Sequence, residues 1–146
     1  MNDHALFLKM VHFTTAVHQV KHDITKDIRL DDITPAQYGI LEYIAVSQPV
    51  TLSQISDCQQ MSMPNTSREI KKLIEKQFCE KSVSSEDRRK QYIKLSSKGQ
   101  ALMNQVFEHI QARFEERIGN ASAADRQLIE QAIDLLYAKV FYSETI

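Results

Sequence analysis

The chain has 146 residues and a formal net charge of −1 at pH 7, and 42% of its residues are hydrophobic. This length suits one domain, or one domain with dimerisation arms, and the apolar content excludes wholesale disorder. Only three Gly and three Pro interrupt the chain, which indicates long helices. No stretch approaches the roughly 18–20 apolar residues that span a bilayer, and the first residues lack the pattern of a signal peptide. We therefore expect a cytoplasmic protein without a membrane partner.

The charge is unevenly distributed along the chain. Residues 62–100 carry ten Lys or Arg and five Asp or Glu, a net charge of +5, so the rest of the chain carries −6. A basic centre between acidic ends is the pattern expected of a local polyanion site. A solvated basic face without a partner would have the same composition, so charge alone leaves both interpretations open.

The first half of the chain is predicted to be helical. Apolar residues at three- and four-residue steps predict a long amphipathic helix over residues 4–29, followed by a linker over residues 30–33. A capping-box pattern at Thr34 and Gln37 predicts a second helix, which ends before Pro49 because the residue preceding a proline disfavours the helical conformation.

Two short, closely spaced helices follow. The same capping pattern at Thr51 and Gln54 predicts a helix through about Cys58, and Ser62 can cap a helix that runs to about Lys76. The residues predicted to face inward on the latter are Thr66, Ile70, Leu73 and Ile74. Two short helices joined by a brief turn are typical of a helix-turn-helix.

From residue 79 the apolar period changes from that of a helix to that of a strand. Val83, Ile93 and Leu95 alternate with polar residues on either side of a charged stretch at residues 85–90. This pattern predicts a β-hairpin with a charged tip.

Two long helices complete the chain, one ending near Ile118 and one capped by Ser122. The predicted fold is mainly α with a small β-hairpin wing: a winged helix-turn-helix at residues 31–99, flanked by an N-terminal helix at residues 1–30 and C-terminal helices at residues 100–146. The flanking helices are too apolar on one face to stand alone in water. They either pack on the centre or bury that face against a second copy.

Three stretches of the sequence resemble the MarR family of bacterial regulators. Residues 33–44, ITPAQYGILEYI, resemble the entry into the family's second helix, and residues 61–74, MSMPNTSREIKKLI, resemble its recognition helix. Residues 87–99, DRRKQYIKLSSKG, resemble its wing signature, in which Asp-x-Arg precedes an apolar residue and Leu-Thr-x-x-Gly. The order of the predicted helices extends the resemblance over nearly the whole chain.

The resemblance implies a bacterial, cytoplasmic transcriptional regulator that binds double-stranded DNA, needs no cofactor and is not an enzyme. It further implies a homodimer built by residues 4–20 and 122–142, most often a repressor acting on a pseudo-palindromic operator. Gln60 and Gln77 stand where the family often has Gly. Because a left-handed cap strains a non-glycine residue, we expect the recognition helix to end by another geometry.

A recognition helix offers the face opposite its buried stripe to the major groove. On that face Asn65 suits adenine, Arg68 suits guanine O6 and N7, and Ser67 can reach a base or a phosphate. Lys71 and Lys72 suit phosphates, which position a protein without specifying sequence. The predicted DNA contacts of this helix are Pro64, Asn65, Thr66, Ser67, Arg68, Lys71 and Lys72. Each of them can also be interpreted as an ordinary surface residue.

At the hairpin tip, Arg88 and Arg89 are candidates for the adjacent minor groove, where a narrow A·T-rich stretch concentrates negative potential. The family pattern implies that Arg89 is the inserted arginine. It also implies that Asp87 orients the wing by pairing with a nearby basic group and does not touch DNA.

MarR-like proteins commonly bind small, often aromatic, molecules between the dimer helices and the winged domain. The apolar faces around Phe13, Val17, Tyr38 and Phe114 could line such a cleft, although a plain core has the same pattern. A small-molecule effector is therefore a candidate partner.

Other functions have weaker support. His18 and His22 lie one helical turn apart and could share a zinc ion, but no further ligand completes the site, so no metal is predicted. Cys58 and Cys79 could sense oxidants, but both occupy positions typical of small apolar residues, which favours buried inert thiols. No phosphate loop, catalytic triad or carboxylate pair is present. The alternatives that remain are a zinc-responsive regulator and a helical protein-interaction module without DNA binding.

Overall fold

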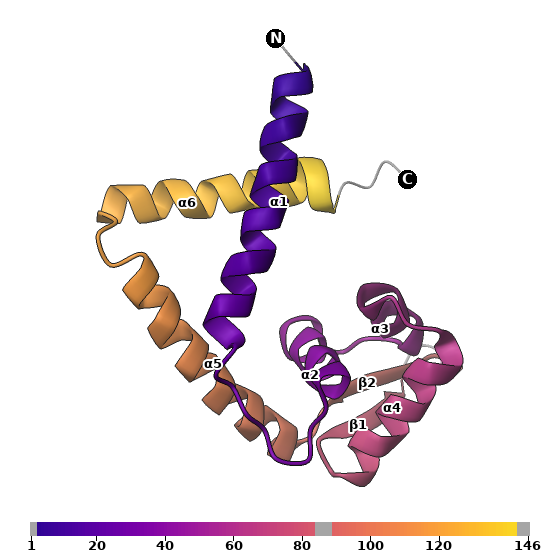
Figure 1. The fold of residues 1–146 in the computed structure, drawn as a ribbon. Coiled ribbons are helices and arrows are strands. Elements are labelled where there is room, and N and C mark those ends of the chain that lie inside the picture. The colour runs from indigo at the N-terminus through magenta and orange to yellow at the C-terminus, as the bar shows by residue number, and fades with distance from the viewer. Residues whose placement is uncertain (1–2, 84–88, 143–146) are drawn as a thin grey trace. The chain divides into compact units, whose positions relative to one another are not determined.

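The computed structural model describes residues 3–83 and 89–142, so the predicted wing residues Asp87 and Arg88 lie outside the described part. The chain forms two compact units, Met1–Ile110 and Gln111–Ile146. The first unit contains α1 (Asp3–Thr25), α2 (Pro35–Ser47), α3 (Leu52–Gln59), α4 (Met63–Glu75), β1 (Cys79–Val83), β2 (Gln91–Leu95) and most of α5 (Ser97–Arg117) (Figure 1). The second contains the end of α5, α6 (Ala123–Leu136) and a π-helical turn, η1 (Tyr137–Phe141). The predicted mainly α-helical fold with a two-stranded wing is confirmed.

The helix starts follow from local hydrogen bonds that the sequence predicts. Thr34 Oγ1 accepts from Gln37 N at 3.1 Å while Gln37 Oε1 accepts from Thr34 N at 3.2 Å. Thr51 and Gln54 form the same reciprocal pair, at 3.1 and 2.9 Å. Each pair satisfies two backbone donors that a helix start leaves without an intrahelical partner, and both predicted capping boxes are confirmed.

The first helix ends at Thr25, four residues earlier than predicted. Three apolar side chains beyond it, Ile28, Leu30 and Ile33, pack against the core of the first unit. A continued helix would spread these side chains around its circumference, so burial of all three favours an irregular linker.

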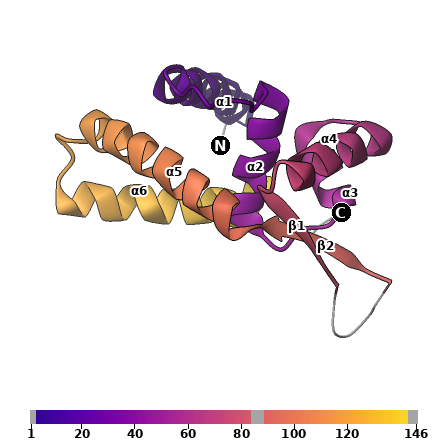
Figure 2. The same ribbon diagram turned by 90° about the horizontal axis from the view of Figure 1, so that it is seen from below.

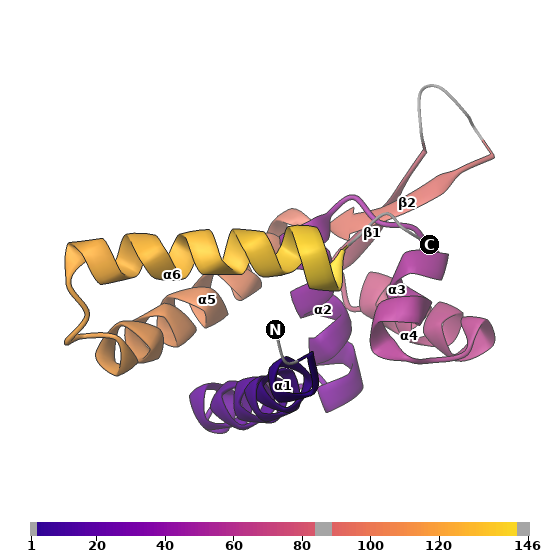
Figure 3. The same cartoon turned by 90° about the horizontal axis from the view of Figure 1, so that it is seen from above.

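The core of the first unit lies where α2, α3, α4 and the hairpin meet. Its members with at most 3% exposure are Ile40, Leu41, Ile44, Val50, Ile55, Ile70, Leu73, Cys79, Ile93 and Met103. The hairpin is antiparallel, with Cys79 opposite Leu95. Val50 and Ile93 also exchange two backbone hydrogen bonds of 3.0 and 2.6 Å, a bridge that the sequence analysis did not predict. Beyond it the two strands run past the helices, and Val83 at their far end is exposed (Figures 2 and 3).

Both helices of the helix-turn-helix end in the left-handed region. Gln60 has a φ of 56° and Gln77 a φ of 70°, so the expectation of another geometry after α4 was wrong. Phe78 N donates to Leu73 O and Gln77 N donates to Ile74 O, both at 2.9 Å, the two bonds of a Schellman motif. These bonds, together with the partial burial of Phe78 against the core, outweigh the cost of a left-handed glutamine, about 1–2 kcal/mol.

The second unit is a helical hairpin. Its turn includes the predicted break at residues 119–120, and Ser122 Oγ accepts from Asp125 N at 3.0 Å, which confirms the predicted cap. Arg126 joins the two helices, since its guanidinium reaches Glu115 Oε2 at 3.0 Å and Ile118 O at 3.3 Å. None of the residues described in α6 and η1 is buried.

Candidate nucleic-acid interface

The turn between α3 and α4 is fixed by hydrogen bonds that aim α4. Ser56 Oγ donates to Met61 O at 2.5 Å, and Met61 N donates back to Ser56 O at 3.1 Å. Ser62 then caps α4 by accepting from Asn65 N at 3.2 Å. These bonds leave little freedom in the direction along which α4 leaves the turn.

The outward face of α4 carries most of the predicted DNA contacts. The side chains of Pro64, Asn65, Ser67, Arg68, Lys71 and Lys72 are all exposed. Thr66 is not: it is completely buried, and its hydroxyl donates to Ser62 O at 2.8 Å. The prediction of Thr66 as a DNA contact is therefore wrong, because its side chain packs inward one helical turn before Ile70.

The two predicted base-reading side chains contact each other. Arg68 Nη2 donates to Asn65 Oδ1 at 2.7 Å, and both residues are exposed. The bond is charge-assisted, and residues three apart lie side by side on a helix. Asn65 therefore holds the Arg68 guanidinium on the outward face of α4 in the free protein.

The inner edge of the same helix is joined to α2. Glu69 accepts from the Gln37 amide at 3.0 Å and lies 3.4 Å from Lys72 Nζ. The hydrogen bond from Gln37 is the main cause that lowers the pKa of Glu69, and Lys72 adds to it. No local sequence pattern indicates a role for Glu69, and the capping-box pattern predicts only a cap for Gln37.

The base of the wing is anchored while its described flanks stay exposed. Gln48 Oε1 accepts from Leu95 N at 2.9 Å and Gln48 Nε2 donates to Gln100, so the end of α2 fixes the end of β2. Arg89 is exposed, as expected of a side chain that reaches a groove. Lys94 pairs with Glu80 at 3.4 Å across the two strands.

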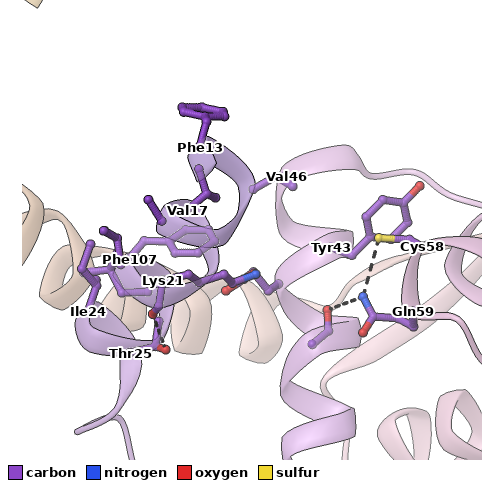
Figure 4. A pocket seen from close by; sticks show the side chains of 15 residues that line it. Phe13, Val17, Lys21, Ile24, Thr25, Tyr43, Val46, Cys58, Gln59 and Phe107 are labelled. Carbon is purple, nitrogen blue, oxygen red and sulfur yellow. Dashed lines mark hydrogen bonds and ion pairs between the residues drawn. The ribbon is translucent and has the colours of Figure 1, made fainter. Parts of the chain in front are cut away.

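A pocket of about 860 Å³ lies between α1, α2, α3 and α5 within the first unit (Figure 4). Phe13 and Val17 line it, as predicted. Tyr38 does not: it borders a separate, smaller pocket of about 340 Å³ against the linker. Phe114 belongs to the second unit and is not among the residues that line this pocket.

An ion pair joins two of the helices that line the 860 Å³ pocket. Lys21 Nζ on α1 lies 2.7 Å from Glu42 Oε1 on α2, and Tyr38 donates its hydroxyl proton to Glu42 Oε2 at 2.9 Å. Burial and the neighbouring Glu42 carboxylate raise the pKa of the Tyr38 phenol, so it remains a donor at neutral pH. The other lining side chains are mostly apolar or aromatic.

The two cysteines differ. Cys79 is buried, which raises the pKa of its thiol to about 12 and makes it a poor nucleophile. Cys58 is exposed and lines the pocket beside Gln59, so the prediction that it is buried was wrong. The short helix α3 buries only Ile55 and Ser56, and Cys58 lies outside that narrow stripe.

His18 and His22 are exposed on α1. Within residues 3–83 and 89–142, no three His, Cys, Asp or Glu side chains gather as a metal site would require. Over the same residues, no helix combines the length and apolar character needed to cross a membrane.

A helix-turn-helix followed by an antiparallel hairpin, with an exposed polar and cationic face on its second helix, defines a winged-helix DNA-binding protein. Residues 31–90 match the sequence pattern of the MarR family. This match and the similar proteins described below support a MarR-type, DNA-binding transcriptional regulator. Proteins of the family are regulators and not enzymes, as the sequence predicted.

The similarity to known proteins covers most of the chain. The HTH-type transcriptional regulator MhqR of Bacillus subtilis (strain 168) is 23% identical over 146 residues, which cover 99% of this chain and 100% of MhqR. The structure of Streptococcus pneumoniae FabT in complex with DNA is 19% identical, with a TM-score of 0.59, and the match covers 93% of this chain and 95% of FabT. S. aureus MepR bound to ethidium bromide is also 19% identical, with a TM-score of 0.62 and coverage of 87% and 92%. The structural likenesses show that the chain has the fold of these proteins.

Proposed function

We propose that the protein binds a pseudo-palindromic operator as a homodimer, with α4 of each copy in a major groove and Arg89 of each wing in the neighbouring minor groove. The observation that carries the proposal is the outward face of α4, where Asn65 and Arg68 lie exposed among cationic side chains. FabT, which shares the fold, has been captured in complex with DNA. A DNA-binding regulator acts where the chromosome lies, so we place the protein in the bacterial cytoplasm.

In this proposed complex, the exposed side chains of α4 differ in the part of the DNA that they contact. Arg68 and Asn65 face base edges, Ser67 reaches a base or a phosphate, and Lys71 and Lys72 hold phosphates. Pro64 lies in the first turn of α4, where it packs against the DNA backbone. Asp87 keeps the wing-orienting role that the family resemblance implies, and Arg88 remains a candidate for the minor groove.

Binding to DNA is tested by fluorescence anisotropy with a duplex that the protein selects from a random pool. The logarithm of the affinity should fall linearly with the logarithm of the salt concentration, because phosphate contacts release counterions. Lys71→Ala should weaken binding to all duplexes alike and reduce this slope by about 1, whereas Lys26→Ala, at an exposed position just after α1, should change neither. Absence of any preference for the selected duplex would refute the proposal.

Dimerisation is supported by apolar surface on the flanking helices. The large apolar side chains more than 50% exposed there are Leu6, Phe7, Leu8, Leu128, Leu135 and Tyr142. Exposed apolar area of this extent marks an interaction surface, and a two-fold dimer matches a pseudo-palindrome with half-sites about one helical turn apart. Sedimentation should show a dimer that Leu128→Glu dissociates and that the neighbouring change Gln127→Glu, also at an exposed position, leaves intact. A monomeric wild-type protein would contradict this part.

The output is proposed to be repression that a small aromatic molecule relieves. Sites for such molecules measure roughly 300–1,000 Å³ and are mostly apolar, which the pocket between α1, α2, α3 and α5 matches. MepR, a protein of the same fold, is known with ethidium bromide bound. Val17→Trp should fill the pocket and abolish release by aromatic compounds while operator affinity is kept.

Oxidation is the second candidate signal, and it is favoured by the exposure of Cys58 on the wall of this pocket. Cys58→Ser should abolish release by peroxide and keep release by aromatic compounds if both signals act. A reporter gene fused to the operator distinguishes repression from activation.

A further inference from the structure

Gln37 is one of three polar side chains buried in the described part of the chain, with 2% exposure. A buried amide is costly unless its donors and acceptor are bonded. Its oxygen accepts from Thr34 N at 3.2 Å and from Lys76 Nζ at 3.1 Å, and its nitrogen donates to Glu69 Oε2 at 3.0 Å. Gln37, which belongs to the capping box of α2, is thus bonded to Glu69 on α4 and to Lys76, which directly follows α4, both more than thirty positions away in sequence.

These bonds form part of a longer chain of contacts, which we call the Gln37 network. Lys76 also donates to Asp32 O at 2.5 Å, in the linker that follows α1. Glu69 also contacts Lys72, one of the proposed phosphate-binding residues. The network therefore runs from the linker, through Lys76, Gln37 and Glu69, to the outward face of α4.

The Gln37 network restrains the rotation of α4 about its own axis, which apolar packing restrains only weakly. Ile70 and Leu73 hold α4 on the core through non-directional contacts, which tolerate small rotations about the helix axis. Each residue step around an α-helix is 100°, so a modest rotation moves Asn65 and Arg68 away from a base edge. Glu69 on α4 and Lys76, which directly follows α4, lie seven residues apart, and Gln37 holds both with directional hydrogen bonds.

We propose that Gln37 is a positioning residue for DNA recognition, which fixes the rotation of α4 and so aims Asn65 and Arg68. This inference rests on the proposed function, since it requires that α4 read DNA. The same hydrogen bond lowers the pKa of Glu69, because it favours the ionised carboxylate that accepts it.

The test exchanges the two partners. Gln37→Glu places a second carboxylate against Glu69 and should lower the ratio of operator affinity to random-duplex affinity about tenfold. The double variant Gln37→Glu/Glu69→Gln restores the bond with donor and acceptor reversed, keeps the net charge, and should return the ratio to within about threefold of wild type. The ratio is the proper readout because a change in net charge shifts both affinities together. Ala36→Glu, which adds the same charge at an exposed neighbouring position, should leave the ratio unchanged.

Two results would overturn the inference while leaving the proposed function intact. One is a Gln37→Glu protein that melts at a lower temperature but keeps the wild-type ratio, since a purely structural role predicts that outcome. The other is a double variant that recovers stability but not the ratio. Should Gln37→Glu fail to fold, Glu69→Ala removes the acceptor without adding a charge, and an unchanged ratio in that variant would equally overturn the inference. A wild-type ratio near one contradicts the proposed function itself.

Discussion

Replacing Asn65 and Arg68 singly and together should show that the two side chains read DNA as one unit. The Arg68 guanidinium donates to the Asn65 amide oxygen at 2.7 Å, so Asn65 restricts the rotamers of Arg68 before DNA arrives. A guanidinium that is already oriented loses less conformational entropy when it binds guanine. Asn65 would need the same amide oxygen to contact adenine N6, and the Arg68 bond therefore competes with independent adenine recognition.

The expected magnitudes follow from this geometry. Arg68→Ala removes a bidentate contact and should cost about 1–3 kcal/mol in operator affinity. Asn65→Ala leaves the guanidinium in place but unrestrained, and should cost about 1 kcal/mol, as for a typical hydrogen bond. In a protein that already lacks Arg68, the Asn65 replacement should cost almost nothing. The coupling energy of the cycle is therefore about 1 kcal/mol, which exceeds the roughly 0.3–0.5 kcal/mol within which independent sites add.

The assay is anisotropy on the selected operator and on a panel in which each base pair is replaced in turn. Both single variants should lose discrimination at the same base pair, because both act through one guanidinium. Ser67→Ala, on the same exposed face, serves as the control and should add independently to either change. If the losses of affinity from Asn65→Ala and Arg68→Ala are additive and map to two different base pairs, the two side chains do not act as one unit. Asn65 would then contact an adenine independently of Arg68.

Three further outcomes test the fold and its chemistry. A Cβ at Gly99 would lie 2.0 Å from Phe78 O, so Gly99→Ala should lower the free energy of unfolding in urea by about 1–3 kcal/mol, and an unchanged midpoint would contradict this packing. Because the pKa of Glu69 is lowered in the folded protein, its contribution to stability is complete above the ordinary value of 4.5 and is lost as the pH falls through the lower folded value. Glu69→Gln should accordingly flatten the stability profile between these two pH values, as urea titrations at several pH values would reveal. At mildly alkaline pH a maleimide should modify Cys58 but not Cys79 in the folded protein, and both once urea is added; rapid labelling of Cys79 without urea would disprove its burial.

The elements of the fold were largely predictable from local signals. Both capping boxes, the Ser62 and Ser122 caps and the hairpin pairing appear where the sequence places them, because each depends on residues close together in the chain. The end of α1 was predicted too late, because the burial of Ile28 and Leu30 against the core overrides helical periodicity.

The site was predictable only in part, because some of its contacts join residues that lie far apart in the sequence. Thr66 was placed both on the inner stripe and among the DNA contacts, and the inner stripe, one turn from Ile70, is the correct position. The bond between Gln37 and Glu69 spans 32 positions, so no local pattern could indicate it. Tyr38 was grouped with Phe13 because both lie on apolar helix faces, yet Tyr38 borders the pocket against the linker and not the larger pocket.

Gln60 and Gln77, the two left-handed glutamines on either side of α4, are positions where the stability of the protein can be raised by substitution. Gln60 and Gln77 each hold a conformation that glycine adopts freely, and the hydrogen bonds that close each turn come from the backbone, so a substitution there removes none of them. Gln60→Gly and Gln77→Gly should each relieve strain of the order of 1 kcal/mol, less the extra freedom that glycine gives the unfolded chain. A sturdier variant of this kind, with every proposed DNA contact unaltered, would be a favourable starting point for crystallising the protein on its operator.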